Sequence, residues 1–467
     1  MTEAIRITLR ESKAARWTAL VLVSLTMLGA YFFVDMMAPL QSLLEKSYGW
    51  QPDTYGFFSG SEYMLNVLGF LIISGIILDK MGIRFTGMTA ASTMLIGGII
   101  KFYGLTPYFS NGGFGYEFFN SFLTNMPASA KVAALGYAVF GIGVEMAGIT
   151  ISKTIVKWFK GKELALAMGM EMATARMGAS VAFFFSGAIA GVDTATENPL
   201  NSVYVGLALL SMGFLTFLVY IFMDSKLDAQ EGIVKGEKGA DEFRLSDIGK
   251  IFMNRGFIYI SLLCVLFYSG IFPFLKYAVN MMQNKLGVSG TTAGYIAGLL
   301  PVGTILLTPL VGTFLDRKGK GATLMIFGAL LMVTAHLIFA IAPVSKGLAI
   351  FAIVILGVAF SLVPASMWPS VPKIVEDRYL GSAYALVFWI QNIGLMFFPW
   401  FVGVVLKWAN PGVSDRIAAG DLTATYNYTV PMLVFAALGI CAIGLGFLLK
   451  MEDKRKNYGL EIPNIKK

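Results

Sequence analysis

The 467-residue chain is 56% hydrophobic and 14% charged, and its mean hydropathy is +0.70. Soluble domains carry about 25% charged residues, so this composition indicates a polytopic membrane protein. One histidine and two cysteines, Cys264 and Cys441, both in apolar runs, exclude an ordinary zinc site and a disulfide framework. We expect no metal and no cofactor.

Twelve apolar segments long enough to cross a bilayer follow one another along the chain. They lie near residues 17–40, 55–78, 86–105, 132–156, 164–190, 202–223, 256–281, 291–315, 322–342, 347–369, 381–406 and 428–450. The stretch 224–255 is charged and poor in apolar residues. It predicts a linker between domains 1–223 and 256–467, either a plain tether or one carrying a surface helix that begins at Ser246.

The positive charge marks orientation. The first segment is preceded by a basic tail with Arg6, Arg10, Lys13 and Arg16, and we expect this tail in place of a cleavable signal peptide. With the N-terminus inside, most of the 36 Lys and Arg residues fall in inner loops and tails, as the positive-inside rule requires. The sequence therefore predicts cytoplasmic termini, and the net charge of +8 does not indicate nucleic-acid binding.

The two halves repeat each other. Residues 75–84, G-x-x-x-D-K-x-G-I-R, follow the second segment, and residues 312–320, G-x-x-x-D-R-K-G-K, follow the eighth. The stretch from Leu164 likewise parallels the one from Leu380. Two parallel halves related by an axis along the membrane normal explain such a duplication. Asp79, Asp316 and Arg317 in the repeated loops are candidates for latching one face of the protein.

Few residues inside the segments can ionise, which makes each a candidate functional residue. They are Asp35, Glu62, Lys101, Glu145, Lys153, Glu171, Arg176 and Lys276. We expect Lys101 and Lys153, near segment ends, to extend toward an interface as structural residues. Asp35 could be a protonatable coupling site or a latch to the second half, and Glu171 is a candidate for an inner gate.

Glu145 and Arg176 stand at one depth on neighbouring segments. Glu145 precedes Lys157 by twelve residues, and Arg176 follows Glu163 by thirteen, on either side of a short basic loop. At about 1.5 Å per residue both lie roughly 18–20 Å into a core about 30 Å thick. They are either a structural ion pair or opposite charges that await a ligand carrying both signs.

Aromatic and amide side chains could complete such a site. Trp368 lies in S-M-W-P, and Gln391 and Asn392 lie in the eleventh segment. A tryptophan wall with amides facing a carboxylate and a guanidinium suits an amphiphilic organic solute, although Trp368 as ordinary core is an equal alternative. The aromatic outer loop, residues 106–130, is either a partial lid or packing at the headgroup level.

Several motifs together resemble one known family. They include residues 31–35 (Y-F-x-x-D), 158–164 (W-F-K-G-K-E-L), 316–320 (D-R-K-G-K), 367–369 (M-W-P) and 390–395 (I-Q-N-I-G-L). Together with the paired loops, they resemble the major facilitator superfamily and, within it, a branch that transports dipeptides. The resemblance implies an all-α membrane protein with 12 transmembrane helices in two pseudo-symmetric six-helix bundles.

The same resemblance implies facilitated, uniport movement of zwitterionic dipeptides, without an obligate protein partner. Glu145 would take the peptide amine and Arg176 the carboxylate, with Tyr31 among the substrate contacts. Glu62 and Lys276 stand where that branch has uncharged residues, so ion coupling or substrate range is expected to differ. No dileucine sorting signal is evident near the N-terminus, and we expect a bacterial inner-membrane location rather than a lysosomal one.

Two alternatives remain open. The chain could transport another small organic anion or zwitterion, with or without proton coupling, using Arg176 and Lys276 as a cationic pair. It could also be a receptor or scaffold that binds a ligand without moving it. An enzyme is not expected, because no nucleophile–base pairing and no phosphate-cradling loop is present in the sequence.

Overall fold

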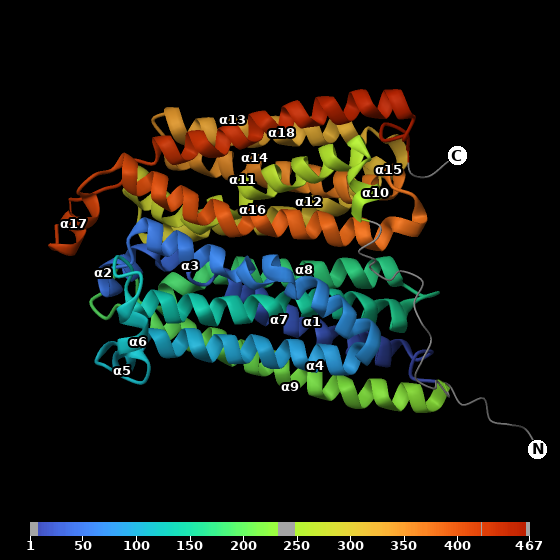
Figure 1. The fold of residues 1–467 in the computed structure, drawn as a ribbon, viewed down its shortest axis with the longest axis horizontal. Coiled ribbons are helices and arrows are strands. Elements are labelled where there is room, and N and C mark those ends of the chain that lie inside the picture. Colours follow the sequence, from blue (N-terminus) through green and yellow to red (C-terminus); the bar gives the residue numbers. More distant parts are fainter. Residues whose placement is uncertain (1–7, 232–247, 422, 464–467) are drawn as a thin grey trace, which may run out of the picture.

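The computed structural model describes residues 8–231, 248–421 and 423–463, and helices dominate them (Figure 1). The first half forms one layer and the second half another. The long helices of the first layer are α1 (Lys13–Asp35), α3 (Pro52–Leu65), α4 (Leu71–Leu105), α7 (Ala128–Phe159), α8 (Leu164–Ile189) and α9 (Leu200–Glu231). Those of the second are α11 (Arg255–Leu286), α12 (Gly290–Lys318), α13 (Gly321–Ile341), α14 (Lys346–Met367), α16 (Leu380–Ala409) and α18 (Thr429–Lys456).

Within the described residues, 11 helical segments are long and apolar enough to cross a membrane. One of them, Pro52–Leu105, has 54 residues and joins α3, the π-helical turn η2 (Asn66–Phe70) and α4. A straight helix of that length would extend about 80 Å, far more than one crossing requires. Gly82, with φ 78° and ψ 176°, interrupts the helix, because this backbone conformation is open to glycine and strained for other residues.

Gly82 divides this element into two arms, one before it and one after it. Contacts with α7 show that these two arms run in opposite directions. Along the arm before Gly82, the contact point on α7 moves forward, from Gly141 to Lys153. Along the arm after Gly82, it moves backward, from Gly143 to Gly136. Counted as continuous elements, the described residues contain 11 such segments, and twelve remains the number that the sequence predicts.

The two ends of the bundle differ in content (Figure 1). One end of the bundle, which we call the terminal end, gathers residues 8–12, the turn at Gly82, loop 160–163 and segment 457–463. The opposite end, which we call the loop end, carries short helices. These are α2 (Gln41–Tyr48), α5 (Pro107–Ser110), α6 (Tyr116–Ser121) and α17 (Val413–Ala418). Small helices α10 (Ile248–Phe252) and α15 (Val371–Ile374) lie at the terminal end.

The predicted linker and outer loop are only partly irregular. Helix α9 continues to Glu231, so residues 224–231 of the expected linker are helical, whereas Ser246 lies outside the described residues. In the outer loop Phe109 is buried, and Phe114 and Phe118 are exposed. The side chain of Lys131 donates hydrogen bonds to the carbonyls of two loop residues and so ties the loop to α7.

Candidate functional site

Glycines set the contact between the halves. Helix α3 of the first half packs along α16 of the second, and α8 packs along α12. A Cβ atom at Gly60 would lie 2.1 Å from the carbonyl oxygen of Met396, and one at Gly56 would lie 2.3 Å from that of Pro399. Only glycine permits the two backbones to approach so closely.

A buried ion pair joins the halves toward the loop end. The Lys276 ammonium lies 2.9 Å from Asp35 Oδ1 and donates to the Val34 carbonyl at 2.9 Å, and both charged side chains are less than one-tenth exposed. The sequence left Asp35 as a coupling site or a latch to the second half, and the ion pair across the halves is the contact that a latch would require. Further polar contacts across the same end are Ser42–Gln283, Ser42–Asn280, Glu45–Tyr426, Asp53–Lys407 and Asp193 with the Gly290 amide.

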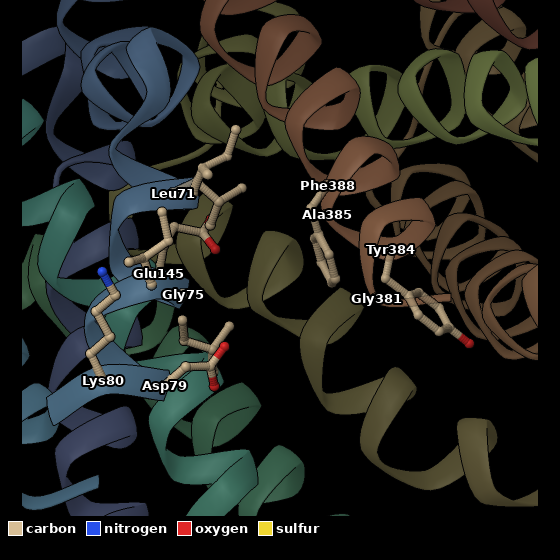
Figure 2. Close-up of a pocket in the computed structure, with 12 residues that line it drawn as sticks. Leu71, Gly75, Asp79, Lys80, Glu145, Gly381, Tyr384, Ala385 and Phe388 are labelled. Atoms are coloured by element: carbon tan, nitrogen blue, oxygen red, sulfur yellow. The ribbon is translucent and has the colours of Figure 1, made fainter. Parts of the chain in front are cut away.

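A cavity of about 500 Å³ lies between the halves (Figure 2). Its walls come from α4, α7 and α16, and its lining residues are Leu71, Ile72, Gly75, Ile76, Asp79, Lys80, Glu145, Ile149, Gly381, Tyr384, Ala385 and Phe388. Asp79 and Lys80 are exposed, so the cavity communicates with the terminal end. This volume falls in the range of small-molecule sites. The protein is therefore closed at the loop end and open at the terminal end.

Glu145 contributes a carboxylate to this cavity (Figure 2). Among the described residues, none forms an ion pair or side-chain hydrogen bond with it, and Arg176 is likewise without an ion pair. The structure therefore does not contain the Glu145–Arg176 ion pair that was one alternative from the sequence. The Glu145 carboxylate therefore stays available to a ligand in the cavity, at a depth where an unpaired charge facing lipid would cost at least about 2.5 kcal/mol.

Aromatic rings surround the Arg176 guanidinium. Its central carbon lies 5.0 Å from the ring centre of Phe360 and 5.7 Å from those of Tyr31 and Phe272. Cation–π contacts of this kind hold the charge without neutralising it. Arg176 does not itself line the cavity described above. Tyr31, predicted as a substrate contact, contacts the Arg176 guanidinium rather than the cavity.

An aromatic path connects Arg176 to the cavity wall. Tyr268 stacks on Phe272 with ring centres 5.7 Å apart, and Trp368 donates from Nε1 to the Tyr268 hydroxyl at 3.0 Å. Trp368 in turn stacks on Phe388 at 4.5 Å, and Phe388 lines the cavity. The predicted tryptophan wall thus lies one layer behind the surface that a solute would meet.

The two predicted amides do not line this cavity. Gln391 Oε1 accepts a hydrogen bond from the Cys264 thiol at 3.5 Å. Asn392 is 1% exposed, and its Nδ2 has no hydrogen-bond partner in the described part of the chain. Glu171 is buried on α8, Arg317 is exposed, and Asp316 stands near the end of α12, so the structure does not bring these residues to the cavity. Lys276 is held by Asp35 rather than paired with Arg176.

The expectation for Lys101 is wrong. Its side chain does not extend to an interface but is fully buried, with the ammonium over the rings of Phe33, Tyr137 and Phe58 at 4.3, 4.4 and 5.0 Å. The aromatic partners come from α1, α3 and α7, so position along one helix could not reveal them. Lys153 is half-exposed and pairs with Asp79 at 2.9 Å.

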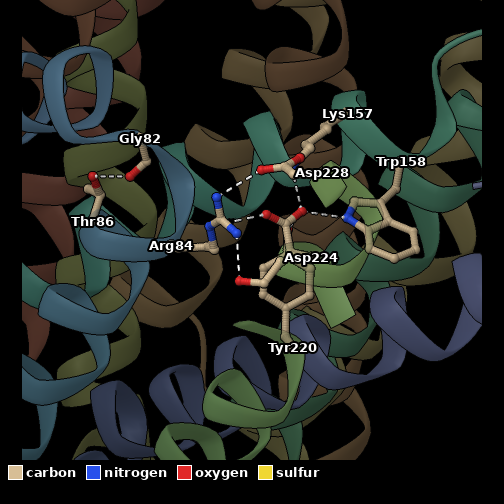
Figure 3. A network of polar contacts seen from close by, with 9 residues as sticks. Gly82, Arg84, Thr86, Lys157, Trp158, Tyr220, Asp224 and Asp228 are labelled. Atoms are coloured by element: carbon tan, nitrogen blue, oxygen red, sulfur yellow. Dashed lines mark hydrogen bonds and ion pairs between the residues drawn. The ribbon is translucent and has the colours of Figure 1, made fainter. Parts of the chain in front are cut away.

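Charged side chains at the terminal end bind within one half (Figure 3). The Asp224 carboxylate, 1% exposed on its side chain, accepts from Lys157 at 2.7 Å, from Tyr220 at 3.0 Å and from Trp158 at 3.1 Å. Arg84, which follows the turn at Gly82, lies 3.7 Å from the same carboxylate. These contacts tie α4, α7 and α9 into one body.

Sequence reasoning missed the apolar and aromatic side of the cavity. Gly381, Tyr384, Ala385 and Phe388 repeat at the helical spacing i, i+3, i+4 and i+7 on α16. That stripe was visible in the sequence, but nothing local distinguished it from a stripe that packs against another helix.

Comparison with known proteins agrees with this architecture. Residues 23–399 and 274–461 match the family described as Major Facilitator Superfamily. The chain belongs to the major facilitator superfamily. Members of this superfamily are transporters rather than enzymes, and this chain is a multi-pass membrane transporter with the all-α superfamily fold.

Vertebrate relatives match most of the chain. It is 27% identical over 406 residues to the lysosomal dipeptide transporter MFSD1 of Mus musculus, covering 84% of this chain and 80% of the relative. The lysosomal dipeptide transporter MFSD1 of Danio rerio is 26% identical over 456 residues, covering 95% and 88%. Among solved structures, the nucleoside transporter NupG has a TM-score of 0.69 at 13% identity, covering 92% of this chain and 99% of that one. A bacterial homologue of the human lysosomal transporter Spinster has a TM-score of 0.68 at 16% identity, covering 94% and 98%.

Proposed function

We propose that this transporter moves zwitterionic dipeptides by alternating access, as a uniporter. The observation that carries the proposal is Glu145, a carboxylate on the wall of a cavity between the halves without an ion-pair partner in the described residues. Arg176, unpaired and surrounded by aromatic rings, supplies the opposite charge. A dipeptide carries an ammonium and a carboxylate that these two groups would bind, and the relatives that match most of the chain are described as dipeptide transporters.

Binding and release follow from the two ends. In the conformation described here, solute would enter or leave at the terminal end while the Asp35–Lys276 contact closes the loop end. Arg176 must come to face the cavity, and the aromatic path through Trp368 and Phe388 gives a connected layer for that movement. Breaking the loop-end contacts would expose the same charges to the other side.

The terminal end is proposed to face the cytoplasm of a bacterium. Loops at this end carry Lys80, Arg84, Lys160, Lys162 and Lys320, as the positive-inside rule expects of a cytoplasmic face. The first and last described stretches of the chain, residues 8–12 and 457–463, lie at the same end (Figure 1). Labelling of a single cysteine introduced at the C-terminus, from inside or outside of intact cells, tests this orientation.

Uptake into proteoliposomes tests the substrate. Glu145→Gln should lower uptake of a labelled dipeptide by about 10- to 100-fold, because a charge-assisted hydrogen bond contributes about 1.5–3 kcal/mol. Arg176→Lys should also impair uptake, because lysine cannot form the two-pronged contact of arginine with a carboxylate. Glu117→Gln, on exposed α6, is the matched control and should transport like the wild type. Wild-type uptake by Glu145→Gln would contradict the assignment.

Thermal stabilisation separates the dipeptide from other solutes. Free dipeptides should raise the melting temperature, whereas the same peptides capped at both ends should not, because capping removes both charges. Stronger stabilisation by dicarboxylates would favour an organic-anion transporter instead. Binding without flux in the proteoliposomes would indicate a receptor.

A further inference from the structure

One hydroxyl group deep in the first half faces two acceptors. The Tyr137 hydroxyl oxygen lies 2.7 Å from the Val34 carbonyl oxygen and 2.7 Å from Glu62 Oε2. Tyr137 is 1% exposed and Glu62 is 3% exposed. Both distances have the length of a complete O–H···O hydrogen bond.

Counting protons relates the state of the carboxyl group to the two contacts of the tyrosine. A tyrosine hydroxyl has one proton to donate, and a carbonyl oxygen has none. If Tyr137 donates to Val34, the second short contact is a hydrogen bond only when Glu62 carries a proton and donates it to the tyrosine oxygen. We propose that Glu62 is a proton-binding site, occupied when the loop end is closed, and that its proton stabilises this closed conformation.

The other charged groups around the site fit this assignment. On α1, Asp35 is already balanced by Lys276 of α11, and on α4 the Lys101 ammonium contacts the Tyr137 ring without a hydrogen-bond partner in the described residues. Tyr63 is the next residue on α3, and α16 meets this level of α3 through the Met396 backbone at Gly60. Glu145 of α7 acts on Glu62 as a like charge. Lys276 and Lys101 are the cations that would compensate the charge of Glu62 after the proton leaves.

The Val34 carbonyl links the proton to the latch. It accepts from Tyr137 and also from the Lys276 ammonium, which binds Asp35 across the halves. When Glu62 loses its proton, Tyr137 donates to the new carboxylate instead, and Val34 loses one of its two donors. The proton site does not depend on which solute is carried. Its role in closure rests on the proposed uniport function, in which the proton binds and leaves from the same side of the membrane and is not carried with the solute.

Infrared difference spectroscopy of the purified protein tests the proton directly and requires no substrate. A protonated-carboxyl band should be present at neutral pH, disappear on alkalinisation, and be absent from Glu62→Gln. It should remain in the control Glu117→Gln, and Tyr137→Phe should shift it, since the acid then loses its acceptor. A spectrum unchanged by Glu62→Gln would overturn the proposal, whatever the substrate proves to be.

A distance measurement tests the link to the latch. Spin labels on cysteines at Asn111 and Asp415, exposed on the two halves at the loop end, report its opening in a background without Cys441. The label distance should increase as the pH rises through the titration of the infrared band. Glu62→Gln can still donate to Tyr137, so it should stay closed at every pH. A pH response that survives in Glu62→Gln, or none in the parent protein, would refute the control of closure.

Discussion

At the loop end, charged and polar side chains of one half bind the other half, as Asp35 binds Lys276. At the terminal end, the ion pairs among the residues that the structure describes stay inside a half, as Arg84 and Lys157 bind Asp224. Under the proposed alternating access, the first arrangement must break whenever the protein opens to the other side, whereas the second can persist throughout. We therefore expect similar residue types to have different roles. The contacts across the halves at the loop end would stabilise one conformation, and the ion pairs within a half at the terminal end would keep that half rigid.

The largest expected effect comes from breaking the buried pair at the loop end. Lys276→Met leaves the Asp35 carboxylate buried without a partner, which should destabilise the closed conformation by about 3–5 kcal/mol. The label pair at Asn111 and Asp415 should then report an open loop end. Adding Asp35→Asn should restore much of the closure, because no unpaired charge remains. If the double variant is as open as the single one, the pair is not the latch.

At the terminal end, Asp224→Asn should destabilise the first half without opening the loop end. The substitution deprives Arg84 and Lys157 of a buried carboxylate, at a cost of roughly 3 kcal/mol in unfolding free energy. The melting temperature should fall while the label distance stays constant. Asp228→Asn is the matched control, with a smaller effect because Asp228 is more exposed. An opened loop end in Asp224→Asn would remove the distinction between the ends.

Overpacking the contact between α3 and α16 should destabilise the closed conformation by an intermediate amount. Gly60→Ala places a methyl group 2.1 Å from the Met396 carbonyl and should cost the closed conformation about 2 kcal/mol. Gly148→Ala, on α7, meets no atom within 4 Å and serves as the control. The label distance should lengthen only in Gly60→Ala. Equal behaviour of the two variants would show that this glycine contact does not hold the halves together.

The smallest effect is expected from acidification at the terminal end. A hydrogen bond from Lys162 lowers the pKa of Glu11. Hydrogen bonds from its own backbone amide and from the Arg16 side chain lower the pKa of the Glu163 carboxyl. A lowered pKa contributes stability at neutral pH that is lost as the pH falls through the folded-state value. Residues 8–12 should therefore lose protection against amide hydrogen exchange in acid, measured relative to the intrinsic exchange rate at each pH, with the loop end unaffected. Unchanged exchange would show that these contacts do not anchor the segment.

Local sequence determined much of this protein. The length and apolar character of the segments predicted membrane helices, the repeated loops at residues 75–84 and 312–320 predicted two related halves, and the spacing around loop 157–163 placed Glu145 deep in the membrane. These features were predictable because burying apolar surface and keeping charge out of lipid act on each segment separately.

Only the tertiary structure showed which side chains the buried polar residues contact. Lys101 contacts rings from three other helices, Tyr137 reaches Glu62 and Val34, and Lys276 finds Asp35 in the opposite half. Each contact joins residues far apart in the chain, and its existence depends on which faces the glycines allow to approach. Helical spacing says which residues share a face, but only the packing of all the helices says what that face meets.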